Sequence, residues 1–218
     1  MSRQAVTIAF LVAACSSAWG SPGVAQIKPK GDPLYKYTEV LVLGPIAGST
    51  VAVIPLAQLI IDPAMQLDSA LFDHRRALRW ADSLVAEALL ERGSEVNWIL
   101  PAQLRKVAQR GLGLVPDPDQ MGQSIHANQK IVDVPPALQN RLHSLASVVS
   151  ARYALVPASL DFGPASTGGV NTMLYLVMTD IRTGRVVYRT QAPGTASSFA
   201  SALRSAMATV LPVDMPGQ

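Results

Sequence analysis

The residue types that most often do chemistry in proteins form no catalytic or metal-binding pattern in this chain. Its three histidines, His74, His126 and His143, show neither the i, i+4 pair nor the short Cys/His cluster that is typical of a metal site. Asp73 and His74 are neighbours on an expected helix, so their side chains point in different directions. No serine lies in a Gly-x-Ser-x-Gly elbow, and the glycine pairs lack the lysine of a phosphate loop. The sequence therefore predicts no enzyme activity, no metal and no cofactor.

A second candidate is the acid pair Asp117 and Asp119, which lies in the run Pro-Asp-Pro-Asp. A calcium loop would need further oxygen ligands at alternating positions and a closing glutamate, and neither is present here. Asp and Pro are also the residues that form turns. We therefore expect a solvated turn at this position.

Cys15 is the residue whose chemistry is easiest to interpret. It is the only cysteine of the 218 residues, and it closes the run Leu11-Val-Ala-Ala-Cys15. This run resembles the lipobox of bacterial lipoproteins, where small residues let the signal peptidase reach the bond before a cysteine that receives the lipid. A lone cysteine in an exported protein cannot form an internal disulfide, so acylation explains it better. The alternative is an ordinary secretory signal cut after Ala18 or Ala25, which would discard Cys15.

The residues around Cys15 predict export. Arg3 precedes an apolar run at 5–14 that is about half as long as a membrane-spanning helix requires. We interpret residues 1–15 as a lipoprotein signal peptide with its lipobox, and 16–34, rich in Ser, Gly, Pro and Lys, as a flexible tether. In lipoproteins of the well-studied type, Ser16 implies transfer to the outer membrane. We expect an outer-membrane lipoprotein that faces the periplasm, held to the membrane through its lipid anchor; the alternative is a secreted or soluble periplasmic protein.

The composition predicts one folded domain. The chain is 49% hydrophobic and 15% charged, which favours a large buried core. We place this domain at 35–211 and a tail at 212–218. The formal net charge is +3, but the 18 Lys and Arg are scattered, with no run longer than Arg75-Arg76. This distribution disfavours nucleic acid as a partner.

The hydrophobic periods predict an α/β fold: a single-domain sandwich in which helices pack against a mixed β-sheet. At its centre we expect a hairpin at Val170–Thr190, with Gly184 in the turn and a short second arm at Val186–Tyr188. The other expected strands are Glu39–Leu43, Thr50–Leu56, Glu95–Leu100 and Tyr153–Leu160, and the expected helices are Leu67–Arg92, Pro101–Arg110, Pro135–Val149 and Phe199–Leu211.

Three local signals refine this prediction. Asp68 is an expected amino-terminal cap of the longest helix, and Gly93 its expected end. Pro157, inside a strand, indicates either a sheet edge or a bulge.

The longest irregular stretch, Gly111–Val134, is where we expect a binding surface. Loops of this length in compact domains are uncommon, and they are often functional. The candidate partner-binding residues of this loop are Asp117, Asp119, Met121 and His126.

Four stretches resemble a family of bacterial envelope domains that includes the amino-terminal domain of TolB, the curli secretion lipoprotein CsgG and LpoB, a lipoprotein activator of a penicillin-binding protein. They are Val51-Ala-Val-Ile-Pro-Leu56, the helix that ends in Glu91-Arg-Gly93, Ala151-Arg-Tyr-Ala-Leu-Val156 and Thr179-Asp-Ile-Arg-Thr-Gly-Arg-Val-Val187. The resemblance covers roughly Thr50 to Leu211. It implies a TolB amino-terminal-like fold in a periplasmic domain that docks other envelope proteins.

From these observations we expect a non-catalytic exported lipoprotein that binds an envelope protein partner in envelope assembly, cell-wall synthesis or secretion. Two alternatives remain. A subunit of a secretion apparatus would need extra membrane-crossing strands, and the segment Gly111–Val134 lacks their alternation of apolar and polar residues. A periplasmic enzyme would need a convergent set of acid, base or nucleophile, for which the sequence gives no signal.

Overall fold

The computed structural model describes residues 40–65, 73–111, 113–128, 130–166 and 168–212. All of them belong to one compact unit, Lys36–Gln218. Cys15, the expected tether at 16–34 and the expected cap Asp68 lie outside the described residues.

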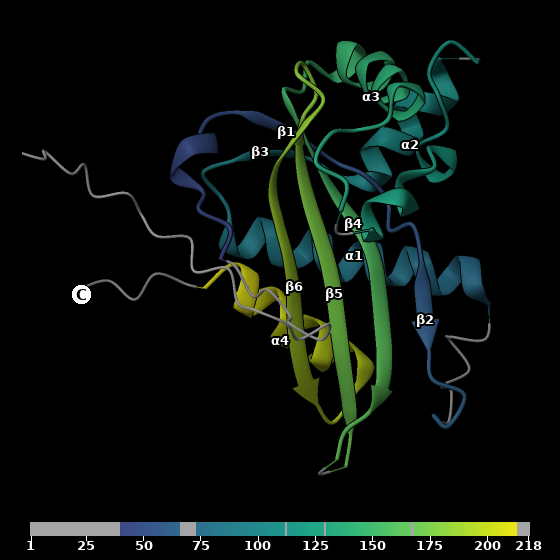
Figure 1. Ribbon diagram of the computed structural model, residues 1–218, viewed down its shortest axis with the longest axis vertical. Coiled ribbons are helices and arrows are strands. Elements are labelled where there is room, and N and C mark those ends of the chain that lie inside the picture. The colour runs from purple at the N-terminus through teal and green to yellow at the C-terminus, as the bar shows by residue number, and fades with distance from the viewer. Residues whose placement is uncertain (1–39, 66–72, 112, 129, 167, 213–218) are drawn as a thin grey trace, which may run out of the picture. The chain divides into compact units, whose positions relative to one another are not determined.

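Among these residues, six strands form one mixed sheet (Figure 1). Its order is β3-β1-β4-β5-β6, and β2 also pairs with β4. The strands β1, β2 and β3 run parallel to their neighbours, whereas β4, β5 and β6 are antiparallel to one another. The predicted mixed α/β fold is confirmed. The strands are β1 Thr50–Val53, β2 Leu59–Ile61, β3 Asn97–Ile99, β4 Tyr153–Pro164, β5 Val170–Asp180 and β6 Arg185–Ala196.

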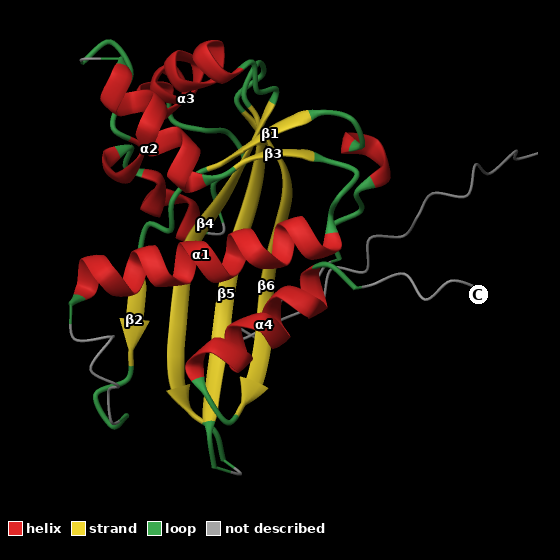
Figure 2. Cartoon of the chain, turned by 180° about the vertical axis from the view of Figure 1, so that it is seen from behind, coloured by secondary structure: helices red, strands yellow, loops and turns green. Residues whose placement is uncertain are grey.

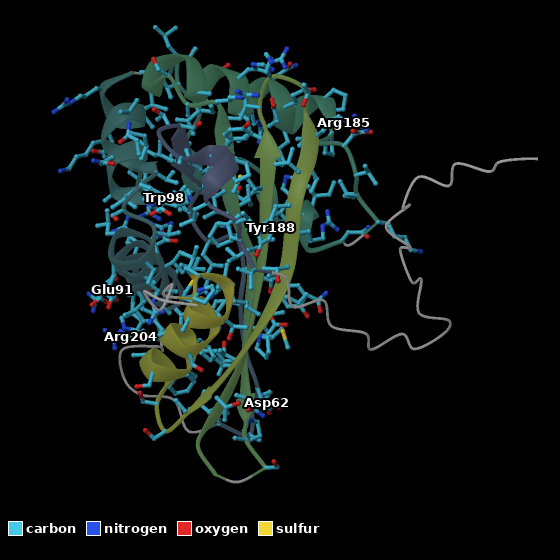
Figure 3. All side chains as sticks on the ribbon, turned by 90° about the vertical axis from the view of Figure 1, so that its left-hand side faces the viewer. Asp62, Glu91, Trp98, Arg185, Tyr188 and Arg204 are labelled. Atoms are coloured by element: carbon cyan, nitrogen blue, oxygen red, sulfur yellow. The ribbon has the colours of Figure 1, made fainter. Side chains whose placement is uncertain are left out.

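The helices cover both faces of this sheet. Figure 2 shows α1 and α4 lying across one face, and side chains fill the space between α4 and the sheet in Figure 3, where Trp98 lies on the same side. Buried side chains of α2 and α3 form a second core with the opposite faces of β1 and β4. The helices are α1 His74–Arg92, α2 Pro101–Arg110, α3 Pro136–Val149 and α4 Phe199–Val210, with short 3₁₀ turns η1 Gly44–Ile46, η3 Pro118–Gln120 and η4 Gln123–Ala127.

The predicted central hairpin is confirmed in its position and its turn. β5 lies between β4 and β6, with Leu174 and Leu176 fully buried on the α4 side. Gly184 has φ +71, a conformation that costs glycine little, and the Asp180 carboxylate accepts the backbone N–H of Thr183. The second arm is longer than expected, because β6 continues as far as Ala196.

Close contact between β6 and α4 depends on one glycine. A Cβ added at Gly194 would lie 2.1 Å from the carbonyl oxygen of Ala202 and 2.6 Å from the nitrogen of Ala206. Gly194 therefore lets the backbone of α4 approach β6 closely.

Some predicted strands differ from the structure. Residues 40–43 form no strand; instead Leu41 donates its N–H to Val210 at the end of α4. β2 was not predicted. β4 runs on to Pro164, with a register shift between Pro157 and Ser159, so the expected bulge is confirmed, while its neighbours on both sides rule out the edge alternative.

The ends of α1 follow local chemistry. Asp73 lies before the helix, and its carboxylate accepts the N–H groups of Arg75 and Arg76, as an amino-terminal cap does. The helix ends at Gly93 as predicted, and the Gly93 carbonyl accepts the indole N–H of Trp98 at 2.6 Å. This bond ties the end of α1 to β3.

Candidate functional site

Two adjoining cavities form a groove between α1 and α2. The first, of about 410 Å³, has mainly charged and polar side chains in its walls. The second, of about 390 Å³, has apolar walls for most of its area, and it shares Arg79 and Arg105 with the first. We call the first the polar cleft, the second the apolar shelf, and the two together the α1/α2 groove. On α1 the groove is bordered by one face of the helix: Arg75, Arg79, Ser83, Ala86 and Leu90.

The polar cleft lies where β1 is interrupted. After Val53 the chain turns at Pro55, and Leu56 and Ala57 form part of the cleft wall before β2 resumes the pairing with β4. The helix that follows β1 covers one face of the sheet, whereas α2 and α3 cover the other. In open α/β sheets, ligands bind in the crevice that such a change of face creates. The cleft therefore occupies a favourable position for binding.

A buried carboxylate organises the centre of the groove. Asp82 of α1 is 4% exposed, and its Oδ1 accepts the backbone N–H of Leu56 at 2.7 Å. Its Oδ2 accepts a hydrogen bond from Arg105 Nη2 of α2 at 2.5 Å. Arg105 also donates from Nε and Nη2 to the carboxylate of Asp119 on η3, at 3.0 and 2.7 Å. We call these three side chains the Asp82–Arg105–Asp119 network.

Burial and hydrogen bonding have opposite effects on the pKa values of Asp82 and Arg105 in this network. Burial raises the pKa of Asp82, although the Leu56 N–H and the hydrogen bond from Arg105 act to lower it. Burial alone would lower the pKa of Arg105, but the hydrogen bonds to Asp119 and Asp82 outweigh burial and raise it. Arg105 is therefore always charged, and its charge is what makes an ionised Asp82 tolerable in this position.

The amino-terminal half of α1 places two further cations on the groove. Arg75 and Arg79 are exposed, one helical turn apart, and both border the polar cleft. In the described part of the chain neither takes part in an ion pair, whereas Arg76 between them pairs with Asp73 at 3.5 Å. These arginines were not among the residues predicted to be functional, and their i, i+4 spacing on a predicted helix was the available signal.

Two of the four candidate residues in the long loop that we expected to bind a partner are buried. Met121 is 1% exposed and belongs to the core that α2 and α3 form with the sheet, and His126 is 2% exposed. Neither side chain is accessible to a partner, so the sequence-based view of these two residues needs correction. Asp117 and Asp119 do border the polar cleft. Asp117 caps η3 by accepting the N–H of Asp119, which fits the predicted turn.

Several side chains tie this loop down. Gln123, which is buried, donates to the carbonyls of Pro55 and Pro118. Arg141 of α3 donates to the carbonyls of Gln120 and Met121, and Arg189 of β6 to those of Asn128 and Ile131. Val115, Met121 and Val134 of the loop also pack in the core that α2 and α3 form with the sheet, so the loop covers part of this face.

His126 is the least satisfied polar side chain of this cover. Within the described residues, neither Nδ1 nor Nε2 has a hydrogen-bond partner. Burial, together with the nearby positive charge of Arg189, lowers the pKa of His126 to about 4. The imidazole is therefore neutral at pH 7, and it cannot act there as an acid–base switch.

Two further absences concern only the part of the chain that the structure describes. No group of three or more His, Cys, Asp or Glu side chains there is placed to hold a metal ion. No helix in that part is both long and apolar enough to span a membrane.

Comparison with known proteins gives structural neighbours only. No protein-family model matches the chain, and no curated protein matches it. The carboxy-terminal domain of LpoB from Salmonella enterica is 17% identical, with a TM-score of 0.43, and the match covers 70% of this chain and 87% of that domain.

Two other solved structures are similar at the same low level. The PelC dodecamer from Paraburkholderia phytofirmans is 16% identical, with a TM-score of 0.41, and the match covers 80% of this chain and 91% of the PelC chain. The lipoprotein GNA1162 from Neisseria meningitidis is 13% identical, with a TM-score of 0.34, and the match covers 68% and 81% of the two chains.

The Asp82–Arg105–Asp119 network gives a first testable prediction. Arg105→Met leaves the Asp82 charge buried, so the free energy of unfolding in urea at pH 7.5 should fall by about 3–5 kcal/mol. The loss should shrink at lower pH, because a protonated Asp82 carries no charge. Adding Asp82→Asn should restore stability to within about 1–2 kcal/mol of wild type. The exposed Arg110→Met is the control, and equal stability of Arg105→Met and Arg110→Met would contradict the role of the network.

His126 gives a second prediction. An unfolded chain binds the imidazole proton near pH 6.5, and the folded chain only near pH 4, so acid favours unfolding. As the pH falls from 6.5 to 4, His126 should therefore lower the free energy of unfolding by up to about 3 kcal/mol. His126→Phe should therefore flatten the pH dependence of the unfolding free energy, and it should raise stability at pH 5. The exposed His143→Gln should keep the wild-type dependence; the same dependence in His126→Phe would refute this assignment.

Proposed function

We propose that this chain is a non-catalytic exported lipoprotein that docks a protein partner of the cell envelope through the α1/α2 groove. An acyl chain on Cys15 holds it on the outer membrane, from which the folded unit faces the periplasm. The partner works in envelope assembly, cell-wall synthesis or secretion. This function needs a shaped surface on a stable scaffold, and it requires no reactive centre.

The α1/α2 groove is the observation that carries this proposal. The helices α1 and α2 form much of its walls, and the part-buried Asp82–Arg105 bond links them. From Arg75 to Leu90 the α1 wall extends for about 22 Å at 1.5 Å per residue. A surface of this length, preorganised on regular elements, binds an extended segment without a cost for ordering loops. The groove combines a charged end with an apolar end, as docking sites for specific partners do.

Site-specific photocrosslinking in the native envelope tests the docking surface. A photoreactive phenylalanine at Ser83 or Ala102, both exposed in the groove, should capture the same envelope protein. The same probe at Ser144, exposed on α3 and outside the groove, should not capture that protein.

A matched pair of variants makes the crosslinking specific. Leu90 and Val148 are both about half exposed, at 56% and 54%, but only Leu90 borders the groove. Leu90→Ser should reduce the yield captured at Ser83, and Val148→Ser should leave it unchanged. Equal capture from Ser83 and Ser144, or a yield that ignores Leu90, would rule out the groove as the docking surface.

The anchor is tested separately by metabolic labelling with a tagged fatty acid. Wild-type protein should incorporate the label and sediment with the outer membrane, and Cys15→Ser should lose both properties. Cys15 is the only cysteine of the chain, so label retained by Cys15→Ser would exclude thioether acylation altogether. Unlabelled wild-type protein would favour the plain secretory signal.

A further inference from the structure

We infer that the occupant of the α1/α2 groove is an extended acidic–aliphatic peptide: two acidic side chains that face Arg75 and Arg79, followed or preceded by an aliphatic side chain on the apolar shelf. This inference rests on the proposed docking function and adds the chemistry of the partner segment. Three features support it: the charges of the groove that already have an ion pair, the position of the apolar shelf, and the distance between the two arginines and that shelf.

Several charged side chains of the groove wall form ion pairs within the chain. Arg105 is neutralised by Asp82 and Asp119, and Glu87 of the apolar shelf pairs with Arg204 of α4 at 3.1 Å. Arg75 and Arg79 are left without an ion pair among the described residues, and they lie on the same wall. A carboxylate of a partner can therefore pair with them without breaking an ion pair of the described residues.

The acidic side of the cleft narrows the choice of anion. Asp117, the cap of η3, and Asp119 within it line the same cleft as the two arginines. A polyanion with closely spaced phosphates would bring several negative charges near these carboxylates. Their repulsion would oppose the attraction of the polyanion to the arginines of α1. A peptide can place its carboxylates on the α1 side only. The arrangement therefore favours an acidic peptide over a polyanion or an anionic membrane surface.

The apolar shelf explains the second half of the motif. Leu90 is a large apolar side chain with most of its surface exposed, and Leu100, Pro101 and Ala86 lie beside it. An isolated exposed leucine is ordinary, but here it continues a concave apolar surface that begins at Arg79. Burying an aliphatic side chain there contributes affinity that the solvated ion pairs alone do not provide.

The helix fixes the spacing of the motif. Arg75 and Arg79 are about 6 Å apart along α1, and Arg79 lies about 10 Å from Ala86 and about 16 Å from Leu90. An extended peptide advances about 3.3 Å per residue. The two acids should therefore stand about two residues apart, with the aliphatic residue about three to five residues beyond the second acid. Either chain direction satisfies these distances.

Fluorescence anisotropy with synthetic peptides tests the inference on the full chain purified in detergent. The probe is a fluorescein-labelled peptide, Gly-Glu-Gly-Glu-Gly-Gly-Leu-Gly-Leu-Gly, together with the peptide of reversed order. At least one of them should bind. Matched peptides with Lys for Glu, or with Ser for Leu, should bind at least about 10-fold more weakly.

Variants of the protein assign the contacts. Arg75→Ser combined with Arg79→Ser should weaken binding of the acidic probe by about 10-fold or more, and the exposed Arg110→Ser should not. Leu90→Ser should weaken binding by about 5-fold, and Val148→Ser should not. Asp117→Asn should tighten binding by about 2-fold, because it removes a like charge from the same cleft.

The outcomes separate this inference from the docking proposal. If crosslinking maps a partner to Ser83 and Ala102 but neither peptide binds, or the arginine variants bind as wild type does, docking stands and the acidic motif is wrong. If phosphatidylglycerol vesicles displace the probe while neutral vesicles do not, the groove is a lipid site and the inference is also wrong. If crosslinking fails as well, the docking function itself is refuted.

Discussion

The burial of the Asp82 carboxylate is the constraint on which the arrangement around the groove depends. An isolated carboxylate in that position would be costly, and the chain offsets this cost with two hydrogen-bond donors, the Leu56 N–H at the interruption of β1 and Arg105 of α2. Asp119 of η3 accepts further hydrogen bonds from Arg105 and so helps to hold it in place. Each partner must be held in place for the others to be useful. The position of α1 on the sheet, the approach of α2 and the fold of the following loop are therefore coupled.

The regular part of the fold could be predicted from the sequence because long periodic segments carry their own signal. β5 with its Gly184 turn, α1 ending at Gly93 and α2 opening at Pro101 follow from local residues. The short or irregular strands could not be predicted. β2 follows Pro55 and consists of only three residues, so its pairing with β4 is decided by tertiary contacts. β6 alternates buried residues with Pro193 and Thr195, so its second half resembles a loop.

The candidate site could be predicted only in part, for a related reason. Asp117 and Asp119 could be singled out because they lie in a run of turn-forming residues, and they border the polar cleft. Met121 and His126 were assigned to a binding loop because the length and composition of the segment indicate irregular structure. These features do not indicate whether such a segment packs on the core, where both side chains are buried. In the sequence, Asp82 has the pattern of a residue on the polar face of a helix. No neighbouring residue indicates that it is buried, or that Arg105, 23 residues away, makes this burial possible.

The packing of the loop buries the side chains of Met121 and His126. This segment is held in place by hydrogen bonds from Gln123, Arg141 and Arg189, although Leu114 and Val132 within it are exposed. The walls of α1 and α2 remain accessible, and the part-buried Asp82–Arg105 bond fixes the distance between them. Preorganised walls reduce the entropy that binding must overcome, so a few well-placed groups suffice for a specific contact. The same ionic bond that stabilises the fold thus keeps Arg79 and the apolar shelf in one continuous groove.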